Sequence, residues 1–241
     1  MEKYNIGYKF RLYPNCTQQQ LISHTIGCCR FVYNHFLIMR RDEWKANHNS
    51  LNYVRTNKLL TDLKKYEETT WLSKADSMAL QESLRDLDCA YQNFFKKRAK
   101  YPRFKSKHNH NQSYRTRNQN DSIRIIDKKI KLPKIGFVKI KQSRTFEGRI
   151  LNATVSHTAS GKYFVSLCVE VDKEKLISTN DGKQIGIDVG LKEFYTDSNG
   201  NTIANPRILK KLSKKLAREQ RRFSHKMPKS RNREKARIRV A

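Results

Sequence analysis

One aspartate lies in an apolar segment whose composition suits phosphodiester chemistry. The segment Ile185–Gly190 reads IGIDVG, which predicts a strand buried on both faces with Asp188 in its middle. An isolated buried carboxylate is costly unless it is paired, protonated or bound to a metal ion. Gly186 and Gly190 leave room for a phosphate and a hydrated cation. Cleavage with two divalent cations needs several carboxylates, so Asp188 needs partners; a structural aspartate bound to backbone amides is the alternative.

Basic residues interleaved with aromatic rings form a second candidate site. The segment Lys96–Lys107 (KKRAKYPRFKSK) holds seven Lys or Arg together with Tyr101 and Phe104, and Tyr114–Arg117 (YRTR) repeats the combination in a predicted loop. Cations meet phosphates, and rings stack on unpaired bases. We assign nucleic-acid contacts to Lys96, Lys97, Arg98, Arg103, Lys105, Lys107, Arg115 and Arg117. A solvated surface is the alternative for any single charged run.

The net charge favours a polyanionic partner. There are 51 Lys plus Arg against 22 Asp plus Glu, which leaves +29 spread over nearly the whole length. Each phosphate that a cation neutralises releases a condensed counterion, so nucleic acid is the expected partner. A membrane surface is the weaker alternative, because no stretch approaches the roughly 18 apolar residues of a spanning helix and the first residues lack a signal-peptide core. We expect a cytoplasmic protein with no membrane partner.

Cysteines and histidines show no metal-ligand spacing. The five cysteines contain no C-x-x-C pair, so we expect buried thiols rather than disulfides or a zinc site. The seven histidines are expected at the surface, because zinc needs four converging ligands.

The elements before residue 100 are predicted to be one strand followed by helices. Tyr4–Tyr13 alternates bulky and polar residues, as strands do. Thr17 with Gln20 fits the capping box of a following helix, and a second helix is expected around Val54–Lys65. A third helix, for which Ser73 and Asp76 offer caps, has an apolar stripe made of Leu80, Leu84, Leu87, Tyr91 and Phe94.

The pattern then changes to period two. Tyr101–Ser178 predicts an all-β module, a small barrel or sandwich, and Ser160–Gly161 marks a hairpin turn in it. Thr179–Lys183 is predicted to be a linker. After the strand that carries Asp188, we expect a turn at Asp197–Asn201 and a helix over Arg207–Phe223, the start of a tail with 15 basic and two acidic residues.

Six segments in the same order resemble TnpB proteins, the OrfB-type proteins of bacterial insertion sequences. They are YKFRLYP (8–14), IGCCRFVYN (26–34), ALQESLRDLDCAYQNFF (79–95), YPRFKSK (101–107), TASGKYFVSL (158–167) and GIDVGLKEF (186–194). The resemblance spans essentially the whole chain, and six collinear segments are more specific than any one of them.

The resemblance implies an α+β multidomain fold. Residues 1–14 would be the first strand of a β-barrel wedge domain, 15–100 a helical recognition domain inserted in it, 101–178 the remaining barrel, and 179–241 the start of a RuvC-like nuclease domain with the RNase H fold. It also implies an RNA-guided DNA endonuclease, known as a transposase, with a guide RNA from the transposon end and a double-stranded DNA target. Asp188 would be the first catalytic acid and would help to hold Mg²⁺, and the protein would act at the bacterial nucleoid.

Family members continue to a Glu, a four-cysteine zinc ribbon and a final Asp that have no counterpart before Ala241. Glu193 and Asp197 lie near Asp188 but match nothing in the family pattern. We therefore expect a truncated or partial copy that binds guide RNA and DNA and does not cut. The alternatives are a repressor-like binding module or decayed transposon remnant, and a generic basic RNA-binding protein, which leaves IGIDVG unexplained.

Overall fold

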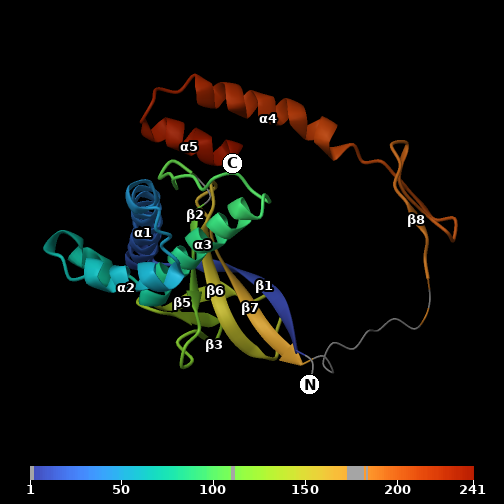
Figure 1. Cartoon of the computed structure of the whole chain (residues 1–241). Coiled ribbons are helices and arrows are strands. Elements are labelled where there is room, and N and C mark those ends of the chain that lie inside the picture. Colours follow the sequence, from blue (N-terminus) through green and yellow to red (C-terminus); the bar gives the residue numbers. More distant parts are fainter. Residues whose placement is uncertain (1–2, 110–111, 173–181, 183) are drawn as a thin grey trace. The chain divides into compact units, whose positions relative to one another are not determined.

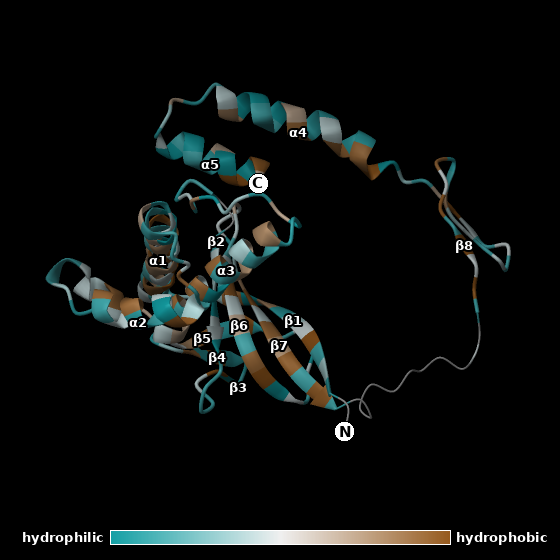
Figure 2. Ribbon diagram, in the orientation of Figure 1, coloured by the Kyte–Doolittle hydropathy of each residue, from teal (hydrophilic) through white to brown (hydrophobic). Residues whose placement is uncertain are grey.

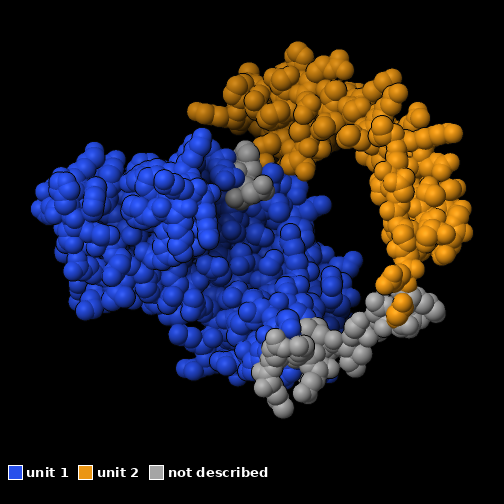
Figure 3. All heavy atoms as spheres, turned by 45° about the vertical axis from the view of Figure 1, so that its right-hand side comes forward, with its two compact units in different colours: residues 1–175 blue, residues 176–241 orange. Residues whose placement is uncertain are grey.

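The protein is a mixture of helices and sheets arranged in two compact units (Figure 3). The computed structural model describes residues 3–109, 112–172, 182 and 184–241. The first unit covers residues 1–175 and the second covers residues 176–241. None of the helices in the described part of the chain is long and apolar enough to cross a bilayer.

A curled, antiparallel, seven-stranded sheet forms the base of the first unit (Figure 1). Its order is β2-β6-β7-β1-β5-β4-β3. The strands are β1 (Lys3–Tyr13), β2 (Gln112–Arg117), β3 (Arg124–Ile126), β4 (Lys129–Leu132), β5 (Gly136–Lys141), β6 (Arg149–His157) and β7 (Tyr163–Asp172). The first strand of the chain pairs with β7 from Lys3 to Leu12 and with β5 from Arg11 to Tyr13. The strands therefore form one sheet, not a sandwich, and the chain leaves it after β1 and returns at β2.

The helices between β1 and β2 are α1 (Cys16–Asn47), α2 (Tyr53–Leu63), the 3-10 helix η1 (Glu67–Lys74) and α3 (Ser77–Phe95). The N-cap of α1 is Asn15, whose side chain accepts a hydrogen bond from the Gln18 amide at 2.8 Å. The predicted Thr17–Gln20 capping box is therefore wrong by two residues, because the extended residue that follows Pro14 already caps the helix. Asp76 caps α3 as predicted.

One apolar core joins the helices to the inner face of the sheet. Phe10 and Leu12 of β1 and Val165 of β7 are at most 1% exposed, and the core continues into α1 through Phe36 and into α3 through Leu84. Apolar and polar bands alternate along β6 and β7 (Figure 2), as expected when every second side chain faces the core. Cys28 and Cys29 are buried as predicted, but Cys16 and Cys89 are exposed.

Two more sequence predictions are wrong in the first unit. Tyr114–Arg117 was expected in a loop, but it lies in β2, where Tyr114 and Thr116 are buried and Arg115 and Arg117 are exposed. Its cross-strand partner β6 supplies the hydrogen bonds that short-range sequence patterns do not reveal. His35 was expected at the surface, but its Nε2 atom is buried and has no hydrogen-bond partner among the described residues.

The second unit contains a small sheet and two helices. Its elements are β8 (Ile187–Asp188), β9 (Glu193–Asp197), β10 (Thr202–Ala204), α4 (Ile208–Ser224) and α5 (Arg231–Val240). The strand order is β10-β9-β8, and the predicted turn at Asp197–Asn201 joins β9 to β10. Of the predicted linker Thr179–Lys183, only Gly182 lies within the described residues.

Candidate nucleic-acid interface

Asp188 lies on a short, solvent-exposed strand. Its backbone pairs with Thr196 of β9, and the apolar neighbours Ile187 and Val189 are 58% and 68% exposed. The prediction that this strand is buried on both faces is therefore wrong for this unit. A sheet face is buried only when another layer packs on it, and among the described residues of the second unit Ile187 and Val189 remain more than half exposed.

The surroundings of Asp188 do not form a metal site by themselves. No group of three His, Cys, Asp or Glu side chains converges anywhere in the part of the chain that the structure describes. Gly190 has a local role, because a Cβ there would lie 2.9 Å from the carbonyl oxygen of Glu193, which accepts the Gly190 amide at 3.1 Å. Around Asp188 the described residues thus supply one carboxylate, whereas Mg²⁺ is bound by several oxygen ligands.

Asp197 is occupied by its own turn. Its carboxylate accepts hydrogen bonds from the Asn199 and Asn201 amides at 2.9 Å and from the Asn201 side chain at 2.8 Å. These bonds, chiefly those from Asn201, lower the pKa of Asp197 below its ordinary value. Asp197 therefore shapes the β9–β10 turn.

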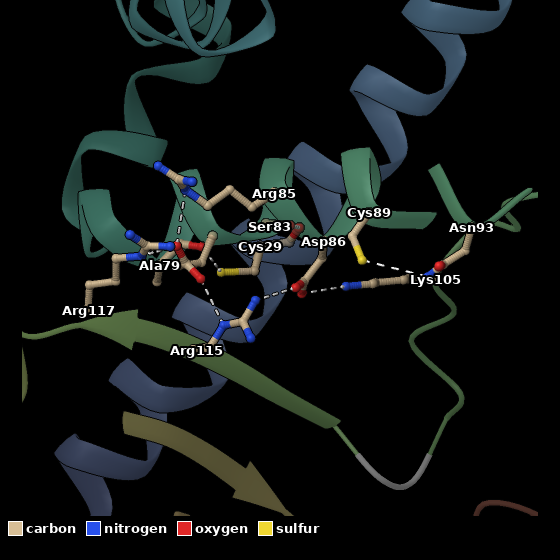
Figure 4. Close-up of polar contacts among 11 residues, drawn as sticks. Cys29, Ala79, Ser83, Arg85, Asp86, Cys89, Asn93, Lys105, Arg115 and Arg117 are labelled. Carbon is tan, nitrogen blue, oxygen red and sulfur yellow. Dashed lines mark hydrogen bonds and ion pairs between the residues drawn. The ribbon is translucent and has the colours of Figure 1, made fainter. Parts of the chain in front are cut away.

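Arg85 of α3 and Arg115 and Arg117 of β2 point toward one another between the two elements (Figure 4), and each lies next to the buried carboxylate of Glu82. The Glu82 side chain is 4% exposed, and its oxygens lie 3.3 Å from Arg85 Nε, 2.8 Å from Arg115 Nε and 2.5 Å from Arg117 Nε. Arg115 also forms an ion pair with Asp86, with 2.7 Å between Nη2 and Oδ1. We call these five residues the Glu82 cluster. Two of the predicted phosphate contacts, Arg115 and Arg117, are thus paired with carboxylates, although their side chains stay 41% and 48% exposed.

The segment Lys96–Lys107 follows α3 and is anchored at two points. The Tyr101 hydroxyl lies 2.9 Å from the Tyr91 hydroxyl. The Lys105 backbone amide donates to Asn34 at 2.8 Å, and its ammonium lies 4.3 Å from the centroid of the Tyr33 ring. Lys105 also lies 3.8 Å from Asp86. The other predicted contacts are exposed and form no ion pair with a described residue: Lys96, Lys97, Arg98, Arg103 and Lys107.

Helix α4 has a continuous basic face. One hollow along it is lined by Lys211, Lys214, Lys215, Arg218, Arg221, Arg222, His225 and Lys226. Within α4, the cations from Lys211 to Arg222 recur at steps of three and four and so share a side of the helix over about 17 Å of its axis. His225 and Lys226 follow directly after the helix. Glu219, the one carboxylate of α4, pairs with Arg222 at 3.0 Å. The sequence pattern predicted a basic tail here but not that these cations share one face.

The vicinal thiols of α1 are poor nucleophiles. Burial raises the pKa of the Cys28 thiol to about 11 and raises that of Cys29 further. Both thiols are therefore protonated near neutral pH, and the basic surfaces remain the strongest functional signal.

Two segments of the chain match known protein families. Residues 1–49 match the family described as "Helix-turn-helix domain", and residues 166–241 match the family described as "Probable transposase". The described part of residues 1–49 contains strand β1 and the single continuous helix α1.

Two relatives match nearly the whole chain. The "Putative RNA-guided DNA endonuclease InsQ" of Escherichia coli (strain K12) is 34% identical over 242 residues, covering 97% of this chain and 57% of that protein. A "Putative RNA-guided DNA endonuclease" of Streptomyces pristinaespiralis is 36% identical over 244 residues, covering 100% of this chain and 60% of that protein. The chain belongs to the TnpB/OrfB family. It spans less than two thirds of the length of these two relatives.

A solved structure also aligns with the TnpB-type chain. The match is to the cryo-EM structure of the Cas12f1-sgRNA-target DNA complex. The alignment covers 92% of this chain and 62% of the matched chain, at 14% sequence identity and a TM-score of 0.38. Similarity at this level carries no inference about function.

Proposed function

We propose that this TnpB-type chain binds a guide RNA and a double-stranded DNA target. The observation that carries the proposal is the basic face of α4, where six Lys or Arg side chains of the helix line one hollow together with His225 and Lys226 just after it. Along about 17 Å, double-stranded DNA carries roughly 10 phosphate charges, so such a face can neutralise several of them. The names of the two relatives, both RNA-guided DNA endonucleases, support RNA and DNA as the two ligands.

The domain interpretation follows the course of the chain. We assign β1 and the strands of residues 112–172 to a wedge domain, because they form one sheet. Helices α1 to α3 leave from this sheet and would be the inserted recognition domain. Strands β8 to β10 would begin a RuvC-like nuclease domain, in which Asp188 is the first catalytic acid and a ligand of Mg²⁺.

We further propose that these 241 residues bind nucleic acid without cutting it. Mg²⁺ would supply charge stabilisation at the scissile phosphate, and this chemistry needs several converging carboxylates. Asp188 is the single acid that the family resemblance assigns here, and Asp197 is engaged in its turn. The chain would therefore contribute recognition and one ligand.

The test is a binding titration by fluorescence anisotropy over a series of salt concentrations. The ligands are RNA transcribed from the transposon end, an unrelated RNA of equal length and a DNA duplex. Changing Lys214, Lys215 and Arg218 together to Gln should reduce the salt slope for duplex DNA by about 2–3, since each lost phosphate contact removes about 0.9. The matched control changes Lys45, Lys58 and Lys74 to Gln, which removes the same charge elsewhere.

Each part of the proposal has its own contrary result. Equal slopes for the two triple variants would refute the role of α4. Equal affinity for the two RNAs would favour a generic RNA-binding protein over guide binding. Cleavage of labelled DNA in Mg²⁺ that is lost in Asp188→Ala would refute binding without cutting.

A further inference from the structure

The outer face of the curled sheet carries rings and cations on neighbouring strands. Arg11 of β1 lies opposite Phe164 of β7 and opposite Lys141 of β5. Tyr13 lies opposite Lys139, one step further along the same face. These residues point away from the core, because their chain neighbours Phe10, Leu12, Val165 and Ile140 are buried. We call the set Lys9, Arg11, Tyr13, Lys139, Lys141 and Phe164 the sheet platform.

The rings and cations of the platform are in contact. Arg11 Cζ lies 5.1 Å from the centroid of the Phe164 ring and 5.7 Å from that of Tyr13. Lys9 Nζ lies 4.8 Å from the centroid of Phe164. A guanidinium that is supported by rings loses little freedom when a base stacks on it, because its orientation is already restricted. Tyr13 is 49% exposed and keeps ring surface available.

The charge of the platform selects the kind of ligand. It holds four cations and no carboxylate, while the acidic residues of β7 lie at the far end of the strand. There Glu170 pairs with Lys3 at 3.3 Å, and Asp172 lies opposite Lys3. The hydroxyl residues Ser156 and Ser166, opposite Phe164 and Lys9, add hydrogen-bonding groups to the same face. The ligand that complements such a surface is an anion with planar, exposed rings.

We propose that the sheet platform binds single-stranded nucleic acid. Unpaired bases stack on Tyr13 and on the Arg11 guanidinium, which Phe164 supports, while Lys9, Lys139 and Lys141 contact the phosphates. Bases inside a duplex are already stacked on their neighbours and do not expose these faces. The platform therefore distinguishes unpaired from paired strands, which the basic face of α4 does not need to do. This inference deepens the proposed nucleic-acid binding and rests on it.

Short homopolymers test the platform with the full chain. The probes are an oligouridine RNA, an oligothymidine DNA and a duplex of equal length. Tyr13→Ala should weaken binding of the single strands by roughly 5- to 150-fold with the salt slope unchanged, since stacking involves no counterion release. Arg11→Lys keeps the charge but loses the plane, and it should weaken the same probes. Lys139→Gln with Lys141→Gln should instead lower the salt slope by about 1.4.

The control is Tyr66→Ala, which removes a tyrosine that is 64% exposed and lies outside the sheet. Circular dichroism confirms that each variant is folded. Losses confined to single strands in Tyr13→Ala and Arg11→Lys, in RNA, DNA or both, support the platform. It is refuted if Tyr13→Ala matches Tyr66→Ala, or if single strands and duplex lose affinity equally. If the platform is refuted but the α4 variant still lowers the salt slope, the proposed function is unaffected. If the chain binds no nucleic acid, both proposals are wrong.

Discussion

Replacing the buried carboxylate Glu82 by glutamine should destabilise the first unit. The substitution keeps the size of the side chain and one acceptor oxygen, but it removes the charge that Arg85, Arg115 and Arg117 share. Glu82 is 4% exposed, so water cannot replace the lost interactions at the carboxylate. The junction between α3 and β2 is the part of the fold that should weaken.

The magnitude follows from the exposure of the partners. Breaking a fully buried ion pair costs about 3–5 kcal/mol. Here the three arginine side chains are 41–48% exposed and regain hydration, so the expected loss is lower, about 2–3 kcal/mol. For a unit of this size, about 1 kcal/mol shifts the melting temperature by roughly 2–4 °C, so Glu82→Gln should lower it by roughly 4–12 °C.

The assay is thermal unfolding followed by circular dichroism at low and high salt. The matched control is Asp62→Asn, which breaks the 2.7 Å ion pair with Lys65, where both side chains are more than half exposed. This exposed pair should contribute less than about 1 kcal/mol, and salt should remove its effect. Equal losses of stability in the two variants, or an effect of Glu82→Gln that high salt abolishes, would contradict a stabilising role of the buried Glu82 charge.

Two further predictions concern titration. Burial lowers the pKa of His35 below its ordinary value, so the unfolded chain takes up the proton first, and stability should fall as the pH drops below about 7. His35→Phe keeps a ring beside Phe31 and removes the unpaired nitrogen, so its melting temperature should fall less over that range; an equal fall would contradict this. The hydrogen bonds to Asp197 lower its pKa, so the turn is stabilised above the ordinary value of about 4 and weakens as pH falls through the folded pKa. The amide resonances of Asn199 and Asn201 should follow that titration and be displaced at all pH values in Asp197→Ala, but less in Asp197→Asn; resonances unmoved by Asp197→Ala would count against it.

Local sequence patterns predicted most helices and strands, because the alternation of a strand and the apolar stripe of a helix are visible within a few neighbouring residues. The alternation in Tyr4–Tyr13 identified β1, and the apolar stripe of residues 80–94 identified α3. They failed where long-range pairing decides the structure. The alternation in strand β2 is short, with only Tyr114 and Thr116 on its buried face, and the strand pairs with β6 along six residues. The predicted burial of β8 is wrong for the same reason, because a strand is buried by another layer that packs on it and not by its own residues.

The sequence by itself determined the excess of positive charge and the collinear segments shared with the TnpB/OrfB family. It also singled out Asp188 as a candidate catalytic residue, because composition and short motifs do not depend on folding. Only the tertiary structure decided which cations are available to a ligand. Arg115 and Arg117 lie next to carboxylates that are about 30 residues away in the chain, whereas Arg11 meets Phe164 through the register of β1 with β7. Cross-strand neighbours are set by long-range hydrogen bonding and packing, and no local pattern encodes that register.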